Sequence, residues 1–220
     1  MNNNPKELRV WTFVIGAAAL VALPAGWLAA AGDGNPARAQ APGPAATDRL
    51  LVFLRETECP APADTKESGD PATTSAVPRE FVAGVHFKED TSTAATVQIA
   101  WLGAAFRQHF VSKTEPALEG AVKLRVHELR VPARDQAIIA ELGDTHETML
   151  GHLWCLLRRQ GKGEDGALAT DGVPNVFYVR DGGGTLRVVD ALWGGAGWEI
   201  GASTTDNPYA WSAGRRVISR

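Results

Sequence analysis

The residues most suggestive of a metal site lie close together near the middle of the chain. His146 and Glu147 are followed by His152, in a segment expected to be helical. Two histidines bind one zinc ion from a helix when they are four residues apart, because that spacing places both on one face. A spacing of six turns the second by about 240° and points the two apart. The sequence therefore predicts no metal site and no cofactor, with His146 in the first helical turn, Glu147 capping it and His152 exposed.

Motifs of nucleophilic or nucleotide chemistry are also missing. The chain has no G-x-S-x-G pattern, and the DGGG run at 181–184 lacks the G-x-G-x-x-G spacing and leads into a predicted strand. The acidic, glycine-containing runs at 163–166 and 171–172 lack the alternation of a calcium loop. We therefore expect a protein that is not an enzyme, although a Ser-His-Asp triad could still assemble from distant residues.

Four aromatic residues crowd the C-terminal region: Trp193, Trp198, Tyr209 and Trp211. Aromatic rings on short strands and glycine-rich loops bind sugars or protein partners. The same rings also fill the core of a small sheet that lacks aliphatic bulk. Both interpretations stay open, and these four residues are the candidate binding surface.

The chain has two cysteines, Cys59 and Cys155. Cys155 falls on the polar face of a predicted helix, and Cys59 falls in a Pro-rich loop predicted over 56–78. An unpaired thiol on the polar face of an exported protein would be reactive, so we predict a Cys59–Cys155 disulfide that fastens the loop to the helix. The alternative is two free thiols. No C-x-x-C pattern indicates a thioredoxin-like redox site.

The composition is that of an ordinary globular protein. The 220 residues include 22 Lys and Arg against 25 Asp and Glu, and 45% are hydrophobic. This excludes a mostly disordered or collagen-like chain. The slightly acidic balance also argues against nucleic acid as a partner, because proteins that bind it usually carry a basic surplus.

The first residues are expected to form a membrane anchor. Lys6 and Arg9 precede an uncharged run over 11–31, which as a helix would span about 30 Å, the thickness of a bilayer core. The alternative is a secretory signal peptide, cleaved at the small-x-small site 37–39 to leave Gln40 first. The run is longer than the apolar region of a usual signal peptide, which has roughly 7–15 residues, so its length favours a retained anchor. Lys6 and Arg9 place the N-terminus in the cytoplasm and the remainder across the membrane.

Three regions follow: a signal-anchor at 1–31 (or a cleaved leader to 39), a Gly/Pro/Ala-rich tether at 32–47, and an extracytoplasmic domain at 48–220. Apolar spacing in the domain predicts helices over 92–113, 132–142 and 144–160. Short apolar runs predict strands over 48–55, 122–131, 176–179, 186–193, 198–202 and 216–219. A change in the phase of alternation at His127–Glu128 suggests a β-bulge.

The predicted fold class is α+β, with about three helices on one face of an antiparallel sheet and a β-meander at the C-terminus. The function expected from these features is that of a non-catalytic accessory or binding protein, tethered to the inner membrane with its domain in the periplasm and joined to a protein partner in a membrane assembly. If the leader is cleaved after Ala39, the protein is soluble and periplasmic or secreted. The alternatives are an exported hydrolase-like enzyme, with its site near His152, and a soluble carbohydrate-binding module.

Overall fold

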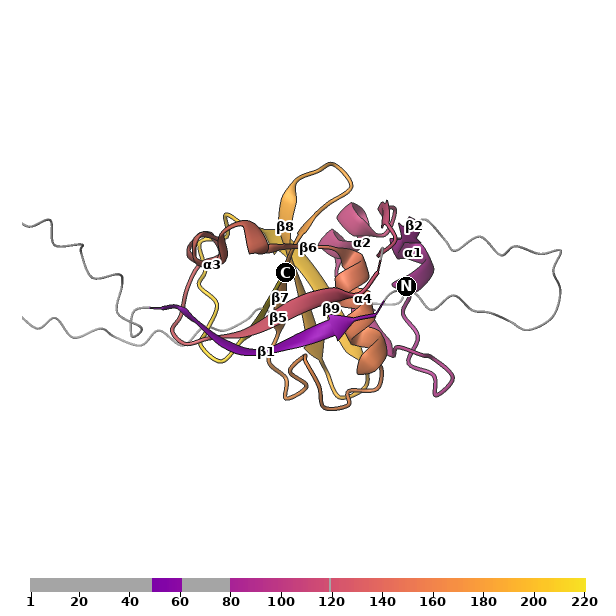
Figure 1. Ribbon diagram of the computed structural model, residues 1–220. Helices are drawn as coiled ribbons and strands as arrows, with labels where there is room; N and C mark the ends of the chain where they lie inside the picture. The colour runs from indigo at the N-terminus through magenta and orange to yellow at the C-terminus, as the bar shows by residue number, and fades with distance from the viewer. Residues whose placement is uncertain (1–48, 61–79, 119) are drawn as a thin grey trace, which may run out of the picture. The chain divides into compact units, whose positions relative to one another are not determined.

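The computed structural model describes residues 49–60, 80–118 and 120–220 (Figure 1). The predicted anchor, the tether and most of the Pro-rich segment lie outside these ranges. Within them, no helix is both long and apolar enough to cross a membrane.

The described ranges form an α+β domain. Its α-helices are α1 (Ala83–His86), α2 (Ala104–Phe110), α3 (Asp135–Leu142) and α4 (Leu150–Arg159). Its strands are β1 (Leu51–Cys59), β2 (Glu80–Val82), β3 (Ile99–Leu102), β4 (Thr114–Pro116), β5 (Val122–Leu129), β6 (Glu147–Thr148), β7 (Asn175–Arg180), β8 (Leu186–Trp193), β9 (Trp198–Thr204) and β10 (Arg216–Ser219). The β7–β8–β9 run is the predicted meander, and each of its strands pairs antiparallel with the next.

The main sheet is mixed, which corrects the prediction of an antiparallel sheet. Its strand order is β1-β5-β10-β7-β8-β9-β3, with β6 beside β7, and β2 pairs β4 in a separate small sheet. Three of the pairings are parallel: β10 with β7, β3 with β9, and β6 with β7. Apolar periodicity reveals a strand but not the direction of its neighbour, so these crossovers were not predictable from it.

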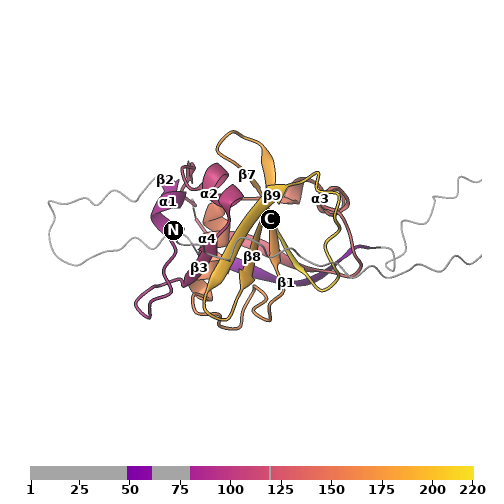
Figure 2. The same cartoon turned by 180° about the vertical axis from the view of Figure 1, so that it is seen from behind.

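The sheet carries a hydrophobic core on each face, whereas the sequence predicted helices on one face only. Alternate residues of β7 divide between the two cores: Phe177 packs with α2 and α4, while Tyr178 packs with Ile138 of α3. Figure 1 and the view from behind in Figure 2 both show α3 and α4 on opposite sides of the strands.

Two-sided burial also explains the phase change seen in β5. Val126 belongs to the α4 core, and Leu129 belongs to the α3 core. These two residues are three positions apart and so point to opposite faces of a regular strand. The bulge lies in the partner strand β1, where the register shifts between Phe53 and Arg55 opposite His127 and Val126.

The predicted helix over 92–113 is wrong in its first half. Residues 99–102 form β3, which pairs with β9, and only Ala104–Phe110 is helical. Gly103 lies between the strand and the helix. Its N–H donates to the Ile200 carbonyl at 2.9 Å, and its extended backbone makes it the N-cap of α2. Ile99, Leu102, Phe106 and Phe110 are all buried, so a strand followed by a short helix gives the same apolar spacing as one helix.

The predicted helix over 144–160 begins later than expected. Residues 143–145 form a 3₁₀ turn, Glu147 and Thr148 form β6, and α4 starts at Leu150. The N-cap is Met149, whose N–H donates to Nδ1 of His152 at 3.1 Å. His152 takes the role that Glu147 was expected to fill. The predicted helix over 132–142 is confirmed at its end, Leu142, where Gly143 has a positive φ (55°), but it begins at Asp135 rather than at Pro132.

Candidate functional site

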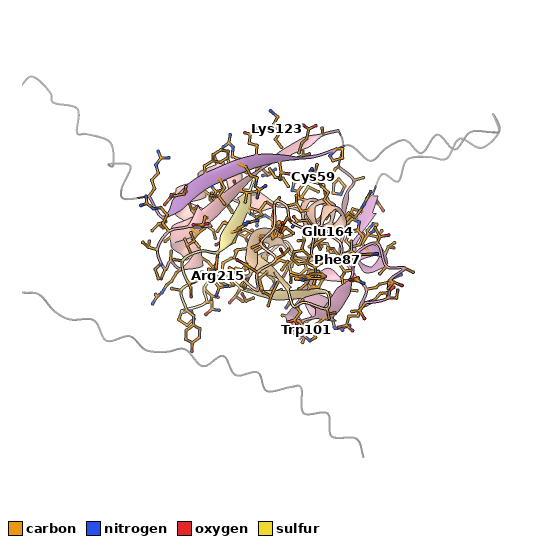
Figure 3. All side chains as sticks on the ribbon, turned by 90° about the horizontal axis from the view of Figure 1, so that it is seen from below. Cys59, Phe87, Trp101, Lys123, Glu164 and Arg215 are labelled. Carbon is orange, nitrogen blue, oxygen red and sulfur yellow. A yellow bond between two sulfur atoms is a disulfide. The ribbon has the colours of Figure 1, made fainter. Side chains whose placement is uncertain are left out.

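Cys59 and Cys155 form the predicted disulfide, with their Cα atoms 6.0 Å apart. Cys59 is the last residue of β1 rather than a loop residue, so the bond fastens an outer strand of the sheet to α4 (Figure 3). Arg159, in the last turn of α4, adds to this attachment by donating to the Glu58 carbonyl at 2.6 Å. The end of β1 is therefore held by a covalent bond and by a charged donor.

The histidines of the α4 region are separated in the structure. His146 contacts the Gly143 carbonyl through Nδ1, and Glu147 pairs with Arg180 at 3.0 Å. His152 was predicted to be exposed, but it is only 2% exposed, and burial lowers its pKa to about 4. Across the ranges that the structure describes, no three His, Cys, Asp or Glu side chains are arranged to hold a metal ion.

The four candidate aromatic residues divide between the two faces of the sheet. Trp198 is fully buried in the α4 core, where its indole N–H donates to the Gln160 carbonyl at 2.8 Å. Trp193 packs against it, with ring centroids 5.6 Å apart. Trp211 packs on the α3 core instead, and Tyr209 is 63% exposed. These residues do not share one surface, and Trp198 offers no exposed atoms to a ligand.

Trp211 belongs to a buried polar cluster on the α3 face. One oxygen of Asp135 accepts from the Trp211 indole N–H at 2.7 Å and from the Tyr178 hydroxyl at 3.0 Å. Asp135 is 1% exposed, and burial raises its pKa while the two hydrogen bonds oppose that rise. Burial, together with the neighbouring Asp135, also raises the pKa of Tyr178. Tyr178 therefore stays a neutral donor.

Arg215 extends this cluster toward β8. Its guanidinium carbon lies 5.0 Å from the centroid of the Trp211 ring. Its Nε and Nη1 atoms are buried and have no hydrogen-bond partner among the described residues. Buried donors are almost always paired, so two on one side chain mark an unusual position. Burial lowers the pKa of Arg215, and the charge of Asp190 opposes this effect.

Asp190 supplies the opposite charge from the middle of β8. Burial raises its pKa to about 6, although the charge of Arg215 opposes this. Its carboxylate occupies space above Gly201 of β9, where an added Cβ would come within 2.7 Å of Oδ1. No ion pair within 4.0 Å joins Asp190 to Arg215 in the part of the chain described here. The two charges nevertheless act on each other, because each shifts the pKa of the other group.

Asp135, Asp190 and Arg215 were not predicted from the sequence as members of a site. One signal was present, because Asp190 interrupts the apolar run of residues 186–193, and a charge inside a buried strand needs a reason. Nothing in the sequence distinguished Arg215, because it comes under the influence of the Asp190 charge in β8 only when the chain is folded. Comparison of the chain with protein-family models, curated proteins and solved structures finds no match.

Proposed function

We propose that the protein is a non-catalytic, membrane-tethered extracytoplasmic binding protein, and that it joins a membrane assembly through β1. The observation that carries this proposal is the exposed apolar run at the start of β1. Val52, Phe53 and Leu54 are 38%, 54% and 41% exposed. Single exposed apolar residues are normal, but here three follow one another on one outer strand, so apolar side chains are presented on both faces of that edge.

The position of β1 in the sheet supports the same proposal. β1 is an outer strand whose one neighbour among the described strands is β5. An outer strand presents backbone N–H and C=O groups that an added strand can pair with. We propose an extended segment of a membrane protein as the occupant, bound by β-strand addition with its apolar side chains on Val52, Phe53 and Leu54.

The expected tether places this strand near the membrane. The Gly/Pro/Ala-rich residues 32–47 immediately precede the domain. From that composition we predict a tether, and a random coil of about 16 residues would span roughly 20–24 Å. The start of β1 is itself fixed to the domain, because the Glu141 carboxylate accepts from the N–H groups of Leu50 and Leu51 at 2.8 and 3.0 Å. Tethering would therefore hold the apolar run of β1 close to the bilayer surface.

The disulfide supports the proposed compartment. Structural disulfides persist in oxidising surroundings such as the periplasm and are rare in the cytosol. The Cys59–Cys155 bond therefore favours an oxidising compartment, which suits the proposed inner-membrane protein with its domain in the periplasm. A soluble periplasmic or secreted form is the alternative if the leader is cleaved after Ala39.

Site-specific photo-crosslinking in native membranes tests the partner. A photoreactive amino acid replaces Phe53, and in a matched control it replaces Val85, an exposed apolar residue of α1. We expect one partner protein to be captured at position 53 and not at 85. Equal capture at both positions, no capture, or capture of only a second copy of this chain would contradict the proposal.

A further inference from the structure

We infer that Trp101, Glu199 and Leu192 form a docking surface for an arginine-bearing segment of a partner protein. These three residues, from β3, β9 and β8, define the Trp101 surface. β3 is the last strand in the sheet order and β1 is the first, and Trp101 lies at the margin of the domain far from Lys123 of β5 (Figure 3). The inference does not depend on a partner at β1.

The three side chains lie in one row across the sheet. Trp101 is opposite Glu199 in the β3–β9 pair, and Glu199 is opposite Leu192 in the β8–β9 pair. Successive residues of a strand point to opposite faces, and Trp198 and Ile200 on either side of Glu199 belong to the α4 core. The Trp101 surface therefore lies on the α3 face.

This part of the α3 face is not covered by the described helices. The α3 core contains no residue of β3 or β9, and Leu192 is half-buried outside both cores. Trp101 is 50% exposed, and its ring rests on Gly103, where an added Cβ would come within 2.9 Å of Cη2. A large aromatic side chain that is held in place and still exposed is typical of the residues that dominate protein interfaces.

The outer edge of β3 is closed to strand addition, so a partner has to bind this face through side chains. Ile99 exchanges two backbone hydrogen bonds with Asp90, at 2.9 and 3.0 Å. The Glu89 carboxylate accepts from the Leu102 N–H at 2.9 Å, and Nε of Arg107 donates to the Leu102 carbonyl at 3.0 Å. Glu89 and Arg107 also pair with each other at 2.6 Å. A second copy of the chain added edge to edge at β3 does not fit this arrangement.

The charge of the Trp101 surface indicates the chemistry of its partner. The Glu199 carboxylate lies against Gly194, where an added Cβ would come within 2.5 Å of Oε1. Over the residues that the structure describes, no ion pair or side-chain hydrogen bond involves Glu199. Arginine stacks its guanidinium on aromatic rings and donates paired hydrogen bonds to carboxylates, so a segment with arginines matches both groups. Leu192 adds an apolar contact, and an acidic segment would be repelled by Glu199.

Fluorine NMR on the full-length protein in an uncharged detergent tests this inference. The tryptophans are replaced by fluorotryptophan, and the Trp101 resonance is assigned from its loss in Trp101→Phe. The probe is the peptide acetyl-Arg-Leu-Arg-amide, with acetyl-Glu-Leu-Glu-amide and cellobiose as comparators. We expect the basic peptide to shift the Trp101 resonance with a dissociation constant of about 1–10 mM. The resonance of the fully buried Trp198 should stay in place.

Glu199→Gln should weaken this binding about fivefold, because it removes the charge and keeps the size of the side chain. Glu80→Gln, which changes an exposed glutamate of β2, is the matched control and should bind as the unmodified protein does. Added salt should weaken binding to the unmodified protein, which gives a readout that needs no variant. The inference fails if the basic peptide causes no shift, if the acidic peptide shifts Trp101 equally, if both glutamate variants weaken binding alike, or if only cellobiose binds.

Discussion

The buried His152 and the half-buried Asp190 have pKa values displaced in opposite directions. Burial lowers the pKa of His152 from 6.5 to about 4 and raises that of Asp190 from 3.8 to about 6. Between pH 4 and 6.5 the unfolded chain binds more protons at His152 than the folded protein does, so this histidine makes stability rise with pH. Between pH 3.8 and 6 the folded protein binds more protons at Asp190, so this aspartate makes stability fall with pH.

The two contributions therefore oppose each other in mildly acidic solution, and single substitutions should separate them. In His152→Gln the glutamine can still accept from the Met149 N–H, but the histidine titration is gone, so stability should fall as the pH rises from 4 to 6. In Asp190→Asn stability should rise over the same range, by about 2 kcal/mol through His152. Urea unfolding at several pH values measures both slopes. Parallel curves for the two variants would contradict this prediction.

The Asp135 cluster gives a second prediction at the scale of single residues. Tyr178→Phe removes a donor from a buried carboxylate and leaves the ring packing in place. We expect a loss of about 1.5–3 kcal/mol of unfolding free energy, as is usual for a hydrogen bond to a charged group. Trp211→Phe removes the other donor and should cost a similar amount. Chemical denaturation measures both, and a loss below about 0.5 kcal/mol in each would show that Asp135 is neutral in the folded protein.

At the scale of elements, the sequence predicted segments correctly where one local rule determined the structure. The β7–β8 hairpin followed from two apolar runs around a glycine turn, and the helix ending at Leu142 followed from Gly143. The Cys59–Cys155 bond followed from the expected exported compartment and from the position of Cys155 on its helix. None of these inferences required knowledge of which strands are neighbours.

The predictions that failed depended on tertiary contacts. The spacing of Ile99, Leu102 and Phe106 fits a helix and also fits a strand followed by a helix, and pairing with β9 decides between them. His152 was expected to be exposed, but the N-terminus of α4 needs an acceptor at that position. The Asp190–Arg215 site joins two segments whose neighbourhood depends on β10 lying between β5 and β7. Periodicity contains no information on any of these contacts.

The disulfide gives a prediction at the scale of elements, because it joins β1 to α4. The double variant Cys59→Ala/Cys155→Ala should lose about 2–5 kcal/mol of unfolding free energy, since the unfolded chain regains the freedom that the cross-link removes. Urea unfolding of oxidised, reduced and double-variant protein measures this loss. Reduced protein and the double variant should unfold at similar urea concentrations. Two reactive thiols in denatured, unreduced protein would contradict the bond itself.

For the whole molecule, the proposed function requires that the domain and the N-terminal segment remain one chain. The described residues contain two hydrophobic cores and a disulfide. The proposal assigns attachment to residues 11–31, because their uncharged run, as a helix, would be long enough to cross a bilayer core. A cleaved leader would release the same folded domain and leave the apolar run of β1 without a membrane nearby.

Intact mass and membrane extraction together distinguish these two forms. For a retained anchor, the native protein should have a mass that includes residues 11–31, and it should leave the membrane with detergent but not with high salt, because burial of apolar side chains in the bilayer does not weaken as ionic strength rises. A variant with Leu20→Arg and Leu28→Arg in the apolar run should lose membrane attachment, since each arginine near the bilayer core costs about 2.5–3.5 kcal/mol. A native mass that corresponds to a chain starting at Gln40 would exclude the anchor. In that case β1 would bind its partner from solution rather than at the membrane.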